Sequence, residues 1–206
     1  MNCSSCEALA CYKDEKDRIP KNCPMITHKK SLGLAENRFL KNPAVGRIAR
    51  AAAHIEAAGY MQWTRLQELI EFARQMGMKK LGIAFCIGLK EEAKTFSRIL
   101  MKNGFGVVSV LCKVGGVPKS KLDIPLEDHL SQSDFEAACN PVAQAEIMNE
   151  ENTDLNIIFG LCIGHDILFS RFSEAPVTTF LVKDRVTGHN PGASIYSRYL
   201  IKRVMK

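Results

Sequence analysis

The stretch Leu81-Gly-Ile-Ala-Phe-Cys-Ile-Gly88 decides the fold, because it joins a short apolar run to a glycine and a following helical pattern. A second stretch, Ile157-Ile-Phe-Gly-Leu-Cys-Ile-Gly164, resembles the first, and a helical pattern and another apolar run follow it too. Strands that are apolar on both faces and alternate with helices are typical of a parallel sheet covered on both sides. The sequence therefore predicts a three-layer α/β fold, flavodoxin-like or Rossmann-like, with about four mainly parallel strands. We expect these strands at residues 80–86, 106–112, 155–162 and 176–182.

Helix signals precede this sheet. Asn42-Pro43 has Asn as an N-cap and Pro at the first helical position. Thr64 and Gln67 have the spacing of a capping box. Both signals predict helices, so two helices should precede the sheet. Further helices are expected at residues 90–103, from Asn140-Pro141 onward, at 166–172 and within 190–206.

The composition suits a single domain with an appendage. The chain has 206 residues, and 46% of them are apolar. We predict a cysteine-rich metal-binding segment at residues 1–30 and an α/β domain at residues 31–206. Within that domain, residues 31–78 form a helical lead-in and residues 79–206 form the sheet core.

The charge and hydropathy patterns exclude several partners. The net charge is +6, but basic and acidic residues are interleaved and aromatic residues make up only 7%, so no nucleic-acid surface is expected. The most apolar run, 155–169, is broken by Asn156, His165 and Asp166 and is too short for a membrane span. The first residues are polar and cysteine-rich rather than an apolar export signal, so we expect a cytoplasmic protein. In that reducing setting, clustered cysteines indicate metal or redox chemistry rather than disulfides.

Four of the eight cysteines crowd the beginning of the chain, at Cys3, Cys6, Cys11 and Cys23. The surrounding residues are mostly polar and cannot bury enough apolar surface to order themselves. Thiolates are good ligands for zinc and for iron–sulfur clusters, since both centres favour soft sulfur donors. The spacing has only one tight Cys-x2-Cys knuckle, whereas structural zinc ribbons have two. We therefore predict one metal centre here, an iron–sulfur cluster in preference to zinc.

The other four cysteines fall at ends of predicted elements. Cys86, Cys112 and Cys162 end strands, and Cys139 precedes the helix start at Asn140-Pro141. Ligands of open parallel sheets bind outside the carboxyl ends of the strands. We therefore expect these four cysteines to face one crevice, as a second site that binds a cofactor or ligand. The alternative is that each cysteine is a small apolar residue of the core.

Polar residues follow the last two predicted strands. His165 comes three residues after Cys162 and could serve as a ligand, a base or a proton carrier. Lys183, Asp184 and Arg185 follow the fourth strand, where they would contact a small anionic ligand or simply form a solvated turn.

As a set, the N-terminal cysteine pattern, Ala84-Phe-Cys-Ile-Gly88, Cys139-Asn-Pro-Val-Ala-Gln-Ala145 and Leu161-Cys-Ile-Gly-His-Asp166 resemble one protein family. This is domain-of-unknown-function family 1847, described as metal-binding proteins of mainly anaerobic prokaryotes. The resemblance implies metal binding through the cysteines, and its anaerobic association favours iron–sulfur chemistry. It implies no particular reaction.

Three functions remain open on the sequence. The first is a cytoplasmic protein with a cysteine-ligated metal centre, acting in redox chemistry, electron transfer with a partner protein, or metal handling. The second is an enzyme that uses Cys86 or Cys162 as nucleophile or one-electron centre, with His165 as acid and base. The third is a module that binds a small anionic ligand in the crevice, with a structural zinc clip.

Overall fold

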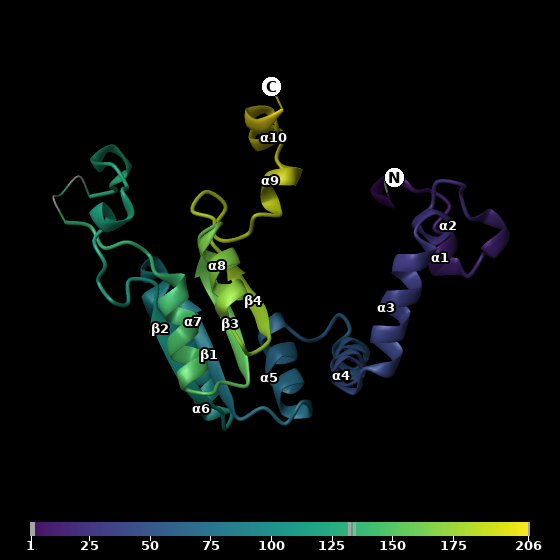
Figure 1. Ribbon diagram of the computed structural model, residues 1–206, viewed down its shortest axis with the longest axis horizontal. Helices are drawn as coiled ribbons and strands as arrows, with labels where there is room; N and C mark the ends of the chain where they lie inside the picture. Colours follow the sequence, from purple (N-terminus) through teal and green to yellow (C-terminus); the bar gives the residue numbers. More distant parts are fainter. Residues whose placement is uncertain (1–2, 132, 134, 206) are drawn as a thin grey trace. The chain divides into compact units, whose positions relative to one another are not determined.

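The computed structural model describes residues 3–131, 133 and 135–205, and it divides the chain into two compact units (Figure 1). The first unit is Met1–Ala58 and the second is Gly59–Lys206. The described helices are α1 (Ala10–Lys13), α2 (Pro24–Thr27), α3 (Lys29–Lys41), α4 (Pro43–Gly59), α5 (Arg65–Gln75), α6 (Lys90–Lys102), α7 (Pro141–Glu150), α8 (His165–Phe172), α9 (Ala193–Tyr196) and α10 (Arg198–Val204). The strands are β1 (Lys80–Phe85), β2 (Gly106–Leu111), β3 (Leu155–Leu161) and β4 (Val177–Val182).

The second unit is built on a four-stranded sheet in the order β2-β1-β3-β4. All three strand pairs are parallel, which confirms the predicted α/β fold. The chain runs from β1 outward to β2 and then returns past β1 to β3. The direction of strand addition therefore reverses between β1 and β3, and the carboxyl ends of these two strands flank the reversal point. Ligand sites of open α/β sheets lie at such a point.

Two hydrophobic cores cover the two faces of the sheet. On one face, α5 and α6 contribute Leu69, Phe96 and Leu100 to a cluster with Leu81 and Ile83 of β1. On the other face, α7 and α8 contribute Met148 and Phe169, which pack with Ala84, Val110 and Ile158. Figure 1 shows α7 lying across the face of β1 and β2. The predicted three-layer arrangement is therefore confirmed, because helices cover both faces of a parallel sheet.

Local sequence signals account for the element ends. Thr64 and Gln67 form the predicted capping box, with both reciprocal hydrogen bonds present. The Asn140 side chain accepts a hydrogen bond from the Ala143 backbone N–H at 3.0 Å and begins α7. The four strands lie within one residue of their predicted bounds. The predicted C-terminal helix is two short helices, α9 and α10, separated at Ser197.

The first unit consists of helices and 3-10 turns. Residues 3–28 hold only helices and turns of three or four residues each, and Ala10 is the buried residue of that stretch. The longer helices α3 and α4 follow. Asn42 accepts hydrogen bonds from the Ala44 and Val45 backbone N–H groups, as its N-cap assignment predicts. The predicted division of the chain at residue 30 stays a prediction.

Candidate functional site

Cys86 and Cys112 leave neighbouring strands at the same level of the sheet. They follow Phe85 and Leu111, which are paired in register between β1 and β2. Both thiols belong to the core on the α7 and α8 face, with exposures of 6% and 2%. The fully buried Gln144 of α7 donates from Nε2 to the Val110 carbonyl at 2.7 Å and to the Phe85 carbonyl at 3.3 Å. This side chain therefore ties the two strand ends together just before the cysteines.

Cys139 reaches the same edge from a distant part of the sequence. The chain leaves the sheet after β2 and lies against it again near Ala138, and the Asn140 backbone N–H donates to the Cys112 carbonyl at 2.7 Å. The Ala138 N–H likewise donates to the Val117 carbonyl at 2.7 Å. The excursion begins at Gly115, whose φ of +86° is left-handed and suits glycine. These two backbone hydrogen bonds join the start and the end of the excursion and hold Cys139 beside the end of β2.

The three thiols form a hydrogen-bonded chain with Cys112 in the middle. Cys139 and Cys86 both interact with the Cys112 thiol, and together with burial they raise its pKa, so that Cys112 keeps its proton. The same contacts lower the pKa values of Cys86 and Cys139. The hydrogen bond with Cys112 lowers the pKa of Cys86 to about 5, assisted by the Gly88 backbone and Lys183. It also lowers the pKa of Cys139 to about 4.

His165 is the second partner of Cys139. It is the first residue of α8, preceded by Gly164 at a φ of +86°. A hydrogen bond with Cys139 raises the pKa of His165 against the opposing effect of burial. The same bond, with the positive charges of Lys113 and His165, helps to hold the Cys139 pKa low. A thiolate beside an imidazolium is the arrangement that gives cysteine low-pKa nucleophilic character.

Cys162 lies in a different environment. The Arg185 Nη2 group is 3.5 Å from its sulfur, and the pKa of Arg185 is raised by this contact. Lys183 approaches Cys86 from the end of β4, with its Nζ 3.1 Å from the position that a side chain at Gly88 would occupy. Basic side chains therefore lie beside Cys86, Cys139 and Cys162.

The structure links Cys86, Cys112 and Cys139, while Cys162 contacts Arg185, whose pKa the charges of Cys86 and Cys139 also raise. The single crevice predicted for these four cysteines stays a prediction. The thiol that hydrogen-bonds to His165 belongs to Cys139. The roles predicted for Cys86 or Cys162 as nucleophile stay predictions. Sequence reasoning missed Gln144 and Lys113; the position of Lys113 directly after a strand-end cysteine was the available signal.

The N-terminal cysteines are arranged otherwise. Cys3 and Cys11 are exposed, and Cys6 and Cys23 are partly buried. Cys23 precedes α2, and its carbonyl accepts from the Thr27 N–H at 3.0 Å. In residues 3–131, 133 and 135–205, no group of three or more Cys, His, Asp or Glu side chains is arranged to hold a metal ion. As placed, these four cysteines therefore do not form the metal site predicted for them, and that site stays a prediction.

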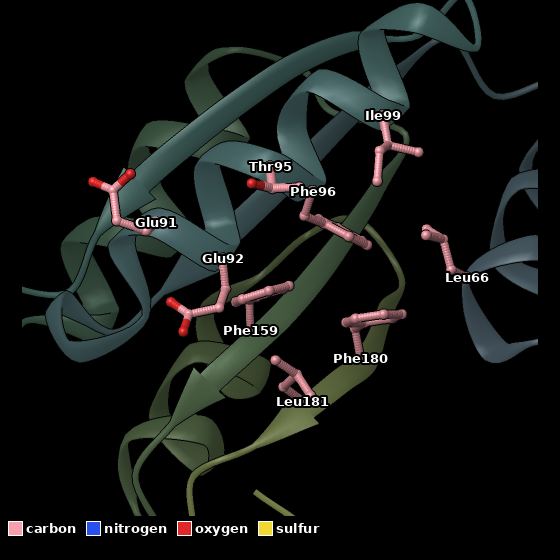
Figure 2. Close-up of a pocket in the computed structure, with 9 residues that line it drawn as sticks. All are labelled: Leu66, Glu91, Glu92, Thr95, Phe96, Ile99, Phe159, Phe180 and Leu181. Atoms are coloured by element: carbon pink, nitrogen blue, oxygen red, sulfur yellow. The ribbon is translucent and has the colours of Figure 1, made fainter. Parts of the chain in front are cut away.

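A cavity of about 520 Å³ lies on the opposite face of the sheet. Figure 2 shows the rings of Phe96, Phe159 and Phe180 along it, with Glu91 and Glu92 at one end. Phe96 contacts Phe159 and Phe180 with ring centroids 5.0 and 4.6 Å apart. The walls of the cavity belong to the face of the sheet that α5 and α6 cover, whereas the thiols lie on the other face.

A membrane-spanning helix is not found in the described part of the chain, since each helix there is too short or too polar for that role.

Fold and site together define a parallel α/β protein with a thiol-rich site at the carboxyl edge of its sheet. The chain belongs to the family described as protein of unknown function (DUF1847), which it matches over residues 23–180. That match includes the strand-end cysteines and His165. An uncharacterized protein of Methanocaldococcus jannaschii is 48% identical over 208 residues, which cover 100% of this chain and 99% of the relative.

Proposed function

We propose that this protein acts through a reactive thiolate at Cys139, with His165 as its proton partner. The carrying observation is the pairing of Cys139 with His165 at the carboxyl edge of the sheet, where Cys139 lies beside the end of β2 and His165 begins the helix after β3. The Cys112 S–H donates to one thiolate at a time, and Cys139 has the additional support of His165 and Lys113. Cys139 is also half-buried, whereas Cys86 and Cys112 are buried. Cys139 is therefore the thiolate that a substrate can reach.

Alkylation with iodoacetamide tests this proposal, with each of the eight cysteines followed by peptide mass spectrometry. An unperturbed thiol has a pKa near 8.5, so its rate falls about tenfold per pH unit below that value. The Cys139 rate should stay within about threefold between roughly pH 5.5 and 8, because its thiolate persists over that range. Cys139→Ser removes this flat component, and Cys162→Ser keeps it.

A low-pKa thiolate is also intrinsically less nucleophilic, so the shape of the profile is more informative than the rate at neutral pH. A Cys139 rate that rises about tenfold per unit between roughly pH 6 and 8 contradicts the proposal. A several-fold lower rate at about pH 5.5 in His165→Asn, with a flat wild-type profile, supports the assigned role of the imidazole.

We propose a second function for the N-terminal segment, which is binding of one metal centre by Cys3, Cys6, Cys11 and Cys23. The supporting observation is four free thiols within residues 3–23, none of them fully buried. Short helices and little buried apolar surface leave this segment easy to rearrange, and metal binding commonly supplies the folding free energy of such segments. We favour an iron–sulfur cluster over zinc. A redox, electron-transfer or metal-handling role in the cytoplasm follows from that choice.

Anaerobic purification with iron, acid-labile sulfide and zinc analysis tests the metal proposal. The expected result is stoichiometric iron and sulfide with visible absorption, or stoichiometric zinc. Protease protection of residues 3–28 should then depend on the metal, because the metal orders the segment. Metal-free protein from anaerobic cells, with unchanged protection after reconstitution, would contradict it.

A further inference from the structure

Cys112 and Cys139 are positioned to form a disulfide. Cys139 packs against the core cluster that contains the buried Cys112, and the two thiols interact. The Asn140 N–H bond to the Cys112 carbonyl, at 2.7 Å, places the two cysteines on adjacent backbone segments. A disulfide needs Cα atoms about 4.4–6.8 Å apart, so it can form only between closely adjacent backbone segments. Both ends of the excursion are fixed, so a bridge across its base would need little backbone movement.

We propose that Cys112 and Cys139 form a redox-active dithiol that reduces small anionic disulfides, with Cys139 attacking and Cys112 resolving. This inference rests on the proposed function, since it requires the Cys139 thiolate. It adds the substrate class and the role of the buried thiol.

The Cys139 thiolate attacks one sulfur of the substrate disulfide, forming a mixed disulfide and releasing the first substrate half as a thiolate, which takes the proton of the His165 imidazolium. The Cys112 thiol then passes its proton to the Cys86 thiolate, its other hydrogen-bond partner. The resulting Cys112 thiolate attacks the Cys139 sulfur and releases the second half. The substrate gains two electrons, and the protein retains a Cys112–Cys139 disulfide.

The charges around the site select the substrate. Lys113 and His165 act on Cys139, Lys183 acts on Cys86, and Arg185 contacts Cys162. Two carboxylates that follow β3 and β4 in the sequence accept hydrogen bonds from backbone N–H groups close to them in the chain. Asp166 accepts from the Ile167 N–H at 2.8 Å, and Asp184 accepts from the Val186 N–H at 2.9 Å. Lys113, Lys183 and Arg185 therefore offer cationic partners at this edge to a disulfide that carries carboxylates.

The test uses the full-length reduced protein and the dianionic aromatic disulfide dithiobis(nitrobenzoate), anaerobically at about pH 5.5, where ordinary thiols react slowly. With limiting probe, the wild type should release two coloured thiolates per probe molecule consumed and retain no aryl group. Non-reducing peptide maps should then join Cys112 to Cys139. Cys112→Ala should release half as much and hold the aryl group on Cys139. Cys162→Ala is the matched control and should release the full amount.

Cys112 is buried, so circular dichroism must show that its variant is folded; an independent readout uses the wild type alone. Acid-quenched time points should show the Cys139 mixed disulfide before the bridge. A persistent wild-type adduct, or a bridge between any other pair, overturns the dithiol assignment. Reaction with the cationic aliphatic disulfide cystamine that is as fast as, or faster than, reaction with the anionic aliphatic disulfide dithiodipropionate overturns the anionic preference. Failure of the proposed function looks different, because Cys139 would then not react rapidly with either reagent.

Discussion

The two sets of four cysteines differ in how they are brought together. The N-terminal set lies within residues 3–23 and consists of exposed or partly buried thiols on short helices and turns. The strand-end set is spread over residues 86–162, yet Cys86 and Cys112 share one core cluster against which Cys139 packs. Closeness in sequence therefore did not create the better-defined site. Parallel strands did, because they deliver residues distant in sequence to one edge.

This contrast predicts different chemistry for the two sets. A buried and hydrogen-bonded thiol has its pKa set by the fold, whereas a thiol in a polar segment depends on what it binds. Four experiments test that division, from the largest expected effect to the smallest.

Metal content should distinguish the sets completely. Replacing Cys3, Cys6, Cys11 and Cys23 together by Ser should abolish stoichiometric metal, because no thiolate ligand remains in the segment. The matched variant replaces Cys86, Cys112 and Cys139 by Ser and should keep the metal. Elemental analysis after anaerobic purification measures both. Metal loss only in the strand-end variant would break the comparison.

Unfolding should remove the difference in alkylation rate between Cys139 and the N-terminal cysteines. In urea above the unfolding midpoint, alkylation of Cys139 at about pH 5.5 should fall tenfold or more, since its thiolate depends on the fold. The rates of Cys3 and Cys11, already exposed, should change by less than about threefold. Iodoacetamide labelling with peptide mapping provides the values. A Cys139 rate insensitive to urea would assign its reactivity to local sequence instead.

His165→Asn should weaken the thiolate by a smaller amount, because Cys112 still donates to it. We expect the Cys139 alkylation rate at about pH 5.5 to fall several-fold. The raised pKa of His165 means that its imidazolium supports the thiolate fully at low pH and loses this effect as pH rises through that pKa. The variant and the wild type should therefore converge at alkaline pH. His54→Asn, an exposed helical position, is the control and should match the wild type throughout.

Gln144→Met should affect stability more than chemistry. It removes two hydrogen bonds that join the ends of β1 and β2, and leaves two buried carbonyls without this donor. The free energy of unfolding should fall by about 1–3 kcal/mol. Chemical denaturation measures this change, and the flat pH profile of Cys139 should survive in the folded variant. Glu146→Gln, on the exposed side of α7, should leave stability within about 0.5 kcal/mol.

The two Cys-Ile-Gly motifs show where sequence reasoning stops. Similar letters at residues 86–88 and 162–164 predict equivalent positions. In the structure, Cys86 enters the core with Cys112, while Cys162 contacts Arg185. The reason lies in β3, whose pairing with β4 shifts register around Phe159, next to Gly160 at a φ of +72°. An irregularity of that kind changes which way the following side chains point, and similar motifs then have different surroundings.

Local rules alone determined much of this protein. Caps at Asn42, Thr64 and Asn140, together with apolar runs, specified the helices and the parallel strands, because those preferences act within a few residues. The cysteine positions likewise marked the carboxyl edge of the sheet as a candidate site. Tertiary structure decided the partners. Only the return of the chain to the sheet near Ala138 sets Cys139 against Cys112 and His165, and contacts between segments so distant in sequence arise from packing rather than local pattern.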